Sequence, residues 1–264
     1  MLSRSFPVLV VGSVSVAVLA VFAATAVATS SQSTVVSSLP GKIWVLASLN
    51  GKAPLRGTEL TSEFTAKRRV SGSAGCNRYT GTYKVSGSTI RIVPLATTRK
   101  ACAEPIERQE TAFLNALSRA RSFVVSGATL TLKSAGGQGL ATFKAQTQAL
   151  AGTSWDVLAY NNGKQAVVSV LVETKLTAAF GKSGGLTGFA GCNDYNASYK
   201  ASAPKISIGP VASTRKYCEQ PAGVSEQETS YLAALETAAT YRVEGSRLEL
   251  RTTDGALAVE LHRK

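Results

Sequence analysis

The stretch Gly72-Ser-Ala-Gly-Cys-Asn-Arg-Tyr-Thr-Gly-Thr-Tyr-Lys84 occurs a second time, with a few changes, as Gly188-Phe-Ala-Gly-Cys-Asn-Asp-Tyr-Asn-Ala-Ser-Tyr-Lys200. The residues that follow repeat as well: Thr98-Arg99-Lys100-Ala101-Cys102 corresponds to Thr214-Arg215-Lys216-Tyr217-Cys218, and Gln109-Glu110 to Gln227-Glu228. In each copy the two cysteines are 26 residues apart. A spacing kept twice in one chain indicates a single structural unit that has been duplicated.

The duplication divides the chain of 264 residues into two domains. We place the first domain at residues 41–146, a linker at 147–150 and the second domain at 151–264. Each domain is long enough to bury a hydrophobic core of its own.

The first residues differ in composition from the rest. Arg4 precedes an apolar run from Phe6 to Val27, and small residues stand at Ala26 and Ala28. This pattern predicts a secretory signal peptide over residues 1–28, cleaved after Ala28. The alternative is a retained membrane anchor, because about 20 apolar residues span a bilayer. The Ser/Thr-rich segment at 29–40 is expected to be a flexible tether. We therefore expect a periplasmic or secreted protein.

Export affects the interpretation of the four cysteines, because thiols pair in an oxidising compartment. Four cysteines allow three pairings, and the duplication favours Cys76 with Cys102 and Cys192 with Cys218, one bridge in each copy. The alternatives are buried free thiols and a zinc site. Zinc is disfavoured because the chain has no Cys-x-x-Cys pair and no nearby histidine. We expect two disulfides, no metal and no cofactor.

The formal net charge of +13 is unevenly distributed. Residues 41–150 carry 16 Lys/Arg against 5 Asp/Glu, hence +11, whereas residues 151–264 carry 12 against 11, hence +1. The densest basic cluster is Lys67, Arg68 and Arg69. Screened long-range attraction to an anionic partner is one interpretation, and a solvated face that favours solubility is the other.

The hydrophobic pattern predicts mostly antiparallel strands. Polar and apolar residues alternate in Thr129–Lys133 and in Arg247–Arg251, and turns rich in Gly and Ser separate such runs. One amphipathic helix is predicted after Pro105 and another after Pro221. The predicted fold class is α+β: two tandem domains, each a curled antiparallel β-sheet of about six to eight strands packed on one α-helix.

The order of these motifs resembles the META domain of the HslJ-like heat-shock protein family, in two tandem copies. The resemblance rests on Trp44 and Trp155, the Gly-x-Ala-Gly-Cys-Asn element, Thr-Arg-Lys-x-Cys and the Gln-Glu pair. It implies a small antiparallel domain of bacterial envelope proteins, associated with stress tolerance or secretion and without an established catalytic activity. The second copy departs from the first at Asp194, where the first has Arg78, so equivalent binding by both copies is in doubt.

A cysteine beside an asparagine invites the hypothesis of a thiol nucleophile with an oxyanion donor. Such a nucleophile needs a base, and the only histidine, His262, has no counterpart in the first copy. We therefore predict no catalytic residue and no enzyme activity. Asn77 and Asn193 are expected to fix tight turns by side-chain hydrogen bonds, and the motif tyrosines to pack.

The pairs Arg99-Lys100 and Arg215-Lys216 are candidates for ligand contact because a bridge nearby would hold them rigid. The alternative is structural, with an arginine bound to a carbonyl or to the helix carboxylates Glu110 and Glu228. The candidate anion-binding residues in the first domain are thus Lys67, Arg68, Arg69, Arg99 and Lys100.

From sequence we expect a non-catalytic, exported protein with a structural or stress-protective role in the bacterial cell envelope. The alternative is a binding or inhibitor module whose basic first domain docks an anionic partner. The partner is unknown; an anionic envelope component or another envelope protein is the candidate, and no specific nucleic acid is expected.

Overall fold

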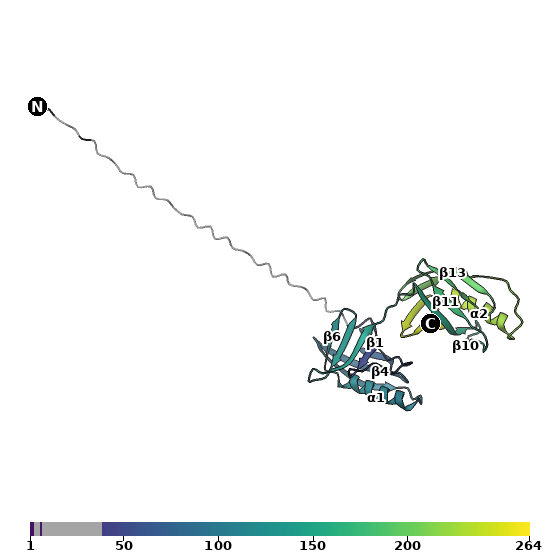
Figure 1. Cartoon of the computed structure of the whole chain (residues 1–264), viewed down its shortest axis with the longest axis horizontal. Helices are drawn as coiled ribbons and strands as arrows, with labels where there is room; N and C mark the ends of the chain where they lie inside the picture. Colours follow the sequence, from purple (N-terminus) through teal and green to yellow (C-terminus); the bar gives the residue numbers. More distant parts are fainter. Residues whose placement is uncertain (3–5, 7–38) are drawn as a thin grey trace. The chain divides into compact units, whose positions relative to one another are not determined.

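The structure is a computed structural model that describes residues 1–2, 6 and 39–264 (Figure 1). The predicted signal peptide at 1–28, and all but the last two residues of the predicted tether at 29–40, lie outside the described residues, apart from residues 1–2 and 6. Within the described residues, no helix is both long and apolar enough to span a membrane.

Eight antiparallel strands form a closed barrel in the first domain. They are β1 (Ile43–Leu49), β2 (Thr61–Phe64), β3 (Arg69–Ser73), β4 (Arg78–Ser86), β5 (Thr89–Thr97), β6 (Ser122–Ser126), β7 (Thr129–Lys133) and β8 (Gly139–Ala145). Each strand pairs with the next along the chain, and β1 pairs with β8 to complete the ring. The helix α1 (Glu104–Arg119) connects β5 to β6.

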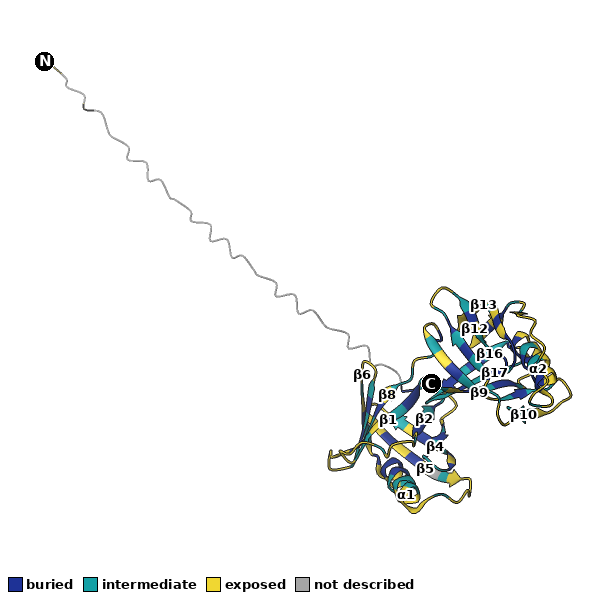
Figure 2. Cartoon of the chain, turned by 45° about the vertical axis from the view of Figure 1, so that its right-hand side comes forward, coloured by how far each residue is buried: buried dark blue, intermediate teal, exposed yellow. Residues whose placement is uncertain are grey.

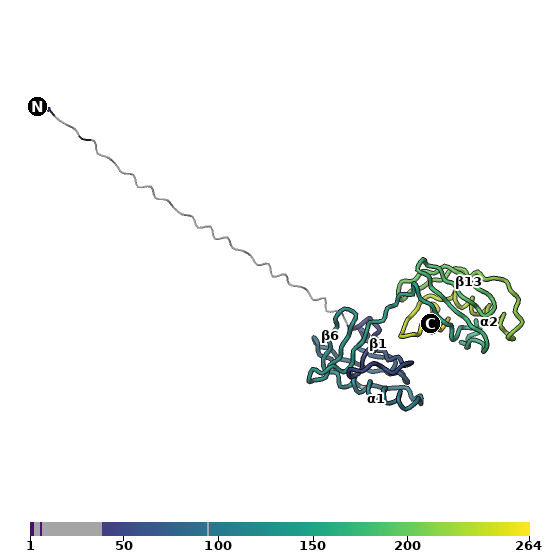
Figure 3. The backbone as a smooth tube through the Cα atoms, in the orientation of Figure 1, coloured from purple at the N-terminus to yellow at the C-terminus, as the bar shows by residue number. Residues whose placement is uncertain are grey.

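The second domain repeats this order with two short additions. Its strands are β9 (Thr153–Asn161), β10 (Val167–Ser169), β11 (Thr177–Phe180), β12 (Gly185–Phe189), β13 (Asp194–Ser202), β14 (Lys205–Ile208), β15 (Ala212–Ser213), β16 (Thr240–Glu244), β17 (Arg247–Arg251) and β18 (Leu257–Arg263). The pairing of β9 with β18 closes the ring, while β10 and β15 are attached outside it. The helix α2 (Val224–Glu236) lies between β15 and β16. Figure 3 follows the backbone through the two domains, from blue to teal and from green to yellow.

Each helix contributes to the core of its barrel. Phe113, Ala116 and Leu117 of α1 are buried, and α1 packs against β1, β5 and β8. The helix α1 begins with a proline, which suits the first turn of a helix. Its acidic residues lie in the first turn and Arg119 in the last, which is the order that the helix dipole favours. Along the strands, buried positions alternate with exposed or partly exposed ones, as the colours in Figure 2 show.

Two tandem antiparallel domains were predicted and are observed, but the description as a curled sheet on a helix was incomplete. The sheet curls until its first and last strands pair, so each domain is a closed barrel without free edges in the ring. The structure also differs at the boundaries. Leu39 is buried and accepts a hydrogen bond from Trp44 Nε1 at 3.2 Å, so the packed part of the first domain includes a residue assigned to the tether. In the predicted linker, Gln148 Oε1 accepts from the Val243 backbone N–H at 2.8 Å.

Candidate functional site

The side-chain amide of Asn77 joins the first cysteine motif to two other segments. Its Nδ2 donates to the Lys100 carbonyl oxygen at 3.1 Å and to Glu110 Oε1 at 3.0 Å. Its Oδ1 accepts from Thr98 Oγ1 at 2.8 Å and from the Lys100 backbone N–H at 2.7 Å. A primary amide offers two donor hydrogens and two acceptor lone pairs, so its full capacity is used. No hydrogen of this amide is left for a reacting oxyanion.

The second copy repeats this arrangement atom for atom. Asn193 Nδ2 donates to the Lys216 carbonyl at 3.2 Å and to Glu228 Oε1 at 3.0 Å. Its Oδ1 accepts from Thr214 Oγ1 and from the Lys216 N–H, both at 2.7 Å. The backbone N–H of each asparagine donates to the other oxygen of the same helix carboxylate, at 2.7 Å in the first copy and 2.9 Å in the second. The expected role of Asn77 and Asn193 in fixing the turn is thus observed in both copies.

A disulfide closes each of these loops. Cys76 is bonded to Cys102 with Cα atoms 6.2 Å apart, and Cys192 to Cys218 with Cα atoms 6.0 Å apart. This is the pairing that the duplication favours, and none of the four cysteines is free. Each sulfur of the motif is therefore in a covalent bridge, and a thiol nucleophile would require its reduction.

The glycine before each cysteine allows a helix glutamine to approach. Gly75 has φ +99°, and a Cβ built there would lie 3.4 Å from Gln109 Nε2. Gln109 Oε1 accepts from the Leu55 N–H at 2.6 Å, and its Nε2 donates to Thr58 Oγ1 at 2.8 Å. Gln227 makes the same pair of contacts in the second copy, with Leu171 and Thr174. The Gln-Glu pair, which the sequence marks only as a repeat, thus links the helix to two loops.

The basic side chains next to these loops make none of the contacts that hold the loops in place. Arg99, Lys100, Arg215 and Lys216 are exposed, and among residues 39–264 their side chains have no hydrogen bond or ion pair. The alternative that an arginine binds the helix carboxylate is wrong, because the asparagine amide and backbone N–H occupy Glu110 and its counterpart. Each loop therefore presents an Arg-Lys pair to solvent on a fixed backbone.

The second basic group lies at the turn between β2 and β3 and includes the first residue of β3. Lys67, Arg68 and Arg69 are exposed, and the Arg68 guanidinium lies 5.7 Å from the centroid of the Tyr83 ring. Burial raises the pKa of Tyr83, and the nearby Arg68 charge opposes that rise. The Tyr83 ring is therefore neutral near neutral pH, and the Arg68 guanidinium lies within cation–π distance of it.

The strand register separates the two basic groups. Arg69 stands at one end of β3, opposite Thr82, and Ser73 stands at the other end, opposite Arg78, which follows the motif asparagine. Four residues of extended chain cover about 13 Å. The five candidate anion-binding residues thus form two separate groups instead of one site.

The motif tyrosines lie inside the barrels. Tyr79 shares a 2.6 Å hydrogen bond with Ser62 Oγ, and Tyr195 shares one of 2.8 Å with the hydroxyl of Tyr231. Burial raises the pKa of Tyr79, of Tyr195 and of Tyr231 well above the usual range. These phenols therefore stay neutral at physiological pH and pack in the core, as expected.

His262, the only histidine of the chain, stands on β18, opposite Arg247 of β17 and Asp156 of β9. Its Nε2 shares a 2.7 Å hydrogen bond with Ser246 Oγ. In the described part of the chain, no group of three or more His, Cys, Asp or Glu side chains could hold a metal ion.

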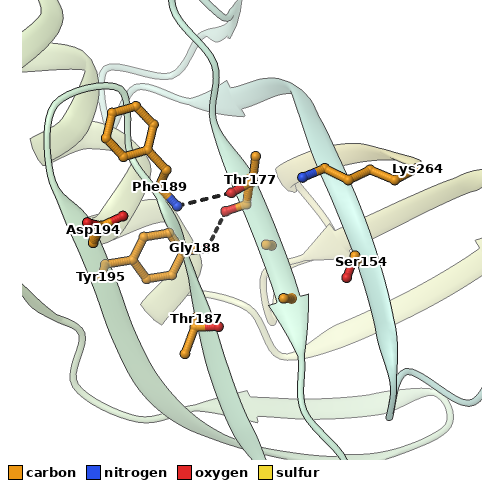
Figure 4. A pocket seen from close by; sticks show the side chains of 10 residues that line it. Ser154, Thr177, Thr187, Gly188, Phe189, Asp194, Tyr195 and Lys264 are labelled. Atoms are coloured by element: carbon orange, nitrogen blue, oxygen red, sulfur yellow. Dashed lines mark hydrogen bonds between the residues drawn. The ribbon is translucent and has the colours of Figure 1, made fainter.

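A cavity of about 470 Å³ opens on the second barrel, at strands β11, β12 and β13. Figure 4 shows Thr177 at its centre, with Phe189, Asp194 and Tyr195 on one side and Lys264 on the other. Thr177 Oγ1 accepts from the Phe189 N–H at 3.0 Å, and the Thr177 carbonyl accepts from the Tyr195 hydroxyl at 2.8 Å. Sequence reasoning did not identify this cavity, although Asp194 was noted as a departure from the first copy.

The fold and loops together define a duplicated small-barrel protein in which each copy has a disulfide and a motif asparagine that hold one loop onto one helix. The chain belongs to the META domain family, whose model matches residues 37–147 and again residues 148–264.

Three solved structures are similar to parts of the chain. An NMR structure of a protein from Burkholderia xenovorans is 29% identical, covers 42% of this chain and 85% of its own, and has a TM-score of 0.36. A second NMR structure is 30% identical over 40% of this chain and 90% of its own, with a TM-score of 0.35. The crystal structure of a duf4847 family protein from Bacteroides vulgatus is 21% identical over 34% of this chain and 61% of its own, with a TM-score of 0.29. No curated protein matches the chain significantly.

Proposed function

We propose that this META-domain protein is a non-catalytic, exported protein of the bacterial cell envelope with a structural or stress-protective role. The observation that carries the proposal is the complete use of the motif in the scaffold. The cysteines are bridged, and each motif asparagine spends all four of its side-chain hydrogen bonds on neighbouring segments. A nucleophile or an oxyanion donor would have to keep one of these groups free.

Two further features support export. Structural disulfides persist in oxidising compartments such as the periplasm. The N-terminal sequence has the charge, apolar run and small residues of a signal peptide, although that segment lies outside the described residues apart from residues 1–2 and 6.

The role is tested by complementation of a deletion strain under heat stress of the envelope. The variant Cys76→Ala/Cys102→Ala removes one bridge and is expected to fold at low temperature. A structural role predicts that this variant protects cells at the permissive temperature and fails at the higher one. Failure at both temperatures, with normal amounts of folded protein in the envelope fraction, would indicate that the sulfurs act chemically and would contradict the proposal.

A second candidate function is the binding of an anionic envelope component by the first domain. It is favoured by the unpaired side chains of Arg99 and Lys100 on a fixed backbone, in a domain whose formal charge is +11. Binding of this kind weakens as salt is added, because ions screen exposed charges over about 10 Å at 0.1 M.

Retention on heparin or anionic vesicles, measured against salt concentration, tests this candidate. The variants are Arg99→Glu/Lys100→Glu and, as a control, Lys84→Glu/Arg91→Glu, which changes the net charge equally on a neighbouring strand pair. Specific binding predicts that only the first variant loses retention. Equal losses would show that net charge alone is responsible.

A further inference from the structure

The duplication makes it possible to compare one surface in two states. In the first domain this surface consists of β2, β3 and β4, and in the second of β11, β12 and β13. Thr61 corresponds to Thr177, and each threonine hydroxyl accepts a backbone N–H from the next strand, at 2.9 Å and 3.0 Å. Each threonine carbonyl also accepts from the following motif tyrosine, at 3.0 Å and 2.8 Å. The two surfaces therefore have the same backbone construction.

In the first domain the surface is occupied by the turn between β16 and β17 of the same chain. Thr61 Oγ1 donates to Glu244 Oε1 at 2.6 Å, and Arg78 Nη2 lies 3.2 Å from the same oxygen. Arg242 of the same hairpin pairs with Glu63 at 2.8 Å. These contacts leave the Glu244 side chain only 14% exposed.

Electrostatics are consistent with a close contact at Glu244. Burial alone would raise the pKa of its carboxyl group, but the Thr61 hydroxyl and the two arginines Arg78 and Arg242 hold the pKa below its usual value. The same contact raises the pKa of Arg242 against the effect of its own burial. These neighbours thus stabilise the charged form of the Glu244 carboxylate.

In the second domain the corresponding surface is the open cavity of Figure 4. The Thr177 hydroxyl accepts from Phe189, yet its own hydrogen has no acceptor among residues 39–264, whereas that of Thr61 is donated to Glu244. Asp194 is exposed and makes no ion pair in the same part of the chain.

The first domain has its own counterpart of the β16–β17 turn, and this counterpart makes no such contact among residues 39–264. Ser126, Gly127 and Ala128 between β6 and β7 correspond to Glu244, Gly245 and Ser246. The glycines share a positive φ, +55° and +63°, but a Cβ at Gly245 would lie 2.1 Å from Glu59 Oε2, whereas nothing lies within 4 Å at Gly127. The first-domain turn is thus exposed and the second-domain turn is covered.

At the β6–β7 turn and at the open cavity, both counterparts of each ion pair of the occupied surface are different residues. The ion pair Glu63–Arg242 is replaced by two apolar residues, Ala179 at the cavity and Val124 beside the turn. Val124 is 49% exposed, so its apolar surface is open to a partner. The pair Arg78–Glu244 is replaced by Asp194 and Ser126, so that a hydroxyl donor meets a carboxylate. At these two positions the β6–β7 turn fits the open cavity.

We propose that the β6–β7 turn of one copy docks onto the β11–β12–β13 surface of a second copy, in the manner in which the β16–β17 turn occupies the first-domain surface within the chain. The contact joins two different surfaces, so it is heterologous and adds copies head to tail.

The test is sedimentation of residues 36–264, the compact unit that contains both domains, over a wide range of concentrations. We expect concentration-dependent association. Val124→Arg and Ala179→Glu are each expected to weaken it about tenfold, because each places an unpaired charge in the contact. Combining the two substitutions recreates the Glu63–Arg242 pair and should restore association. The control is Val167→Arg, which changes a valine of similar exposure, 47%, on β10 and should have no effect.

Misfolding of a variant is distinguished by mixing. A Val124→Arg copy retains a native cavity and an Ala179→Glu copy retains a native turn, so the mixture should associate at lower concentration than either variant alone. A protein that sediments as a monomer at every concentration would overturn the proposal. Association that neither substitution weakens would overturn it as well.

Discussion

Replacing Asn77 by alanine should destabilise the first domain substantially. The change removes four side-chain hydrogen bonds, three to neutral groups and one to the Glu110 carboxylate. At about 1 kcal/mol for each neutral bond and about 2 kcal/mol for the charged one, the upper bound is about 5 kcal/mol. Thr98 and Lys100 are exposed and can turn to water, so we expect a loss of about 3 kcal/mol. For a domain of this size that corresponds to a fall of about 10–15 °C in Tm.

The two tryptophans allow each domain to be followed separately. Trp44 and Trp155 are both fully buried, one in each barrel. Urea unfolding followed by fluorescence in a Trp155→Phe background therefore reports the first domain. The control is Asn115→Ala, which alters an exposed asparagine of α1 and should change the free energy of unfolding by less than about 0.5 kcal/mol. If Asn77→Ala cost no more than this control, the motif asparagine would not be a structural tie and the reasoning would be refuted.

Three further expectations concern the bridges, the domain contact and the core. Cys76→Ala/Cys102→Ala should lower the free energy of unfolding by about 3.5 kcal/mol in the chain-entropy model, measured by urea unfolding; a loss below about 1 kcal/mol would contradict it. The contribution of the Glu244 charge to the free energy of unfolding should be complete above pH 4.5, the ordinary pKa of a glutamate, and vanish as the pH falls through the lowered pKa of Glu244. The urea midpoints of Glu244→Gln and of the wild type should therefore converge in acid; a difference between the midpoints that persists there would show that charge is not responsible. Burial raises the pKa values of Tyr79 and Tyr195, so their contribution to stability should be complete below about pH 10 and be lost gradually as the pH rises toward the raised pKa values. Their phenolate absorbance should therefore appear only as the protein unfolds in alkali; reversible ionisation of all tyrosines in the folded protein would rule this out.

Much of the fold could be predicted because it depends on local patterns. The alternation in Arg247–Arg251 predicts a strand directly, and β17 has the predicted bounds. A proline in the first turn of α1 and another shortly before α2 indicate where the helices begin. Closure of the barrels could not be predicted, because it depends on pairing between β1 and β8 at opposite ends of a domain. Nothing local in either strand specifies that partner.

The candidate site was predictable in part for a similar reason. The repeated cysteine spacing indicated the bridges, and the repeated asparagine indicated a fixed turn. The partner of the asparagine was missed: Glu110 lies 33 residues further along the chain, and its carboxylate was assigned to an arginine as the structural alternative. The contact of Glu244 with Arg78, 166 residues apart, could not be identified from the sequence, where it corresponds only to the changes to Asp194 and Ser126 in the other copy of each residue.

The most direct test of the account is peptide mapping by mass spectrometry of the unreduced protein, alkylated before any reduction. The claim that the motif is structural requires two links, Cys76–Cys102 and Cys192–Cys218, and no alkylated cysteine. Links between the two domains, or an alkylated Cys76 or Cys192, would contradict it.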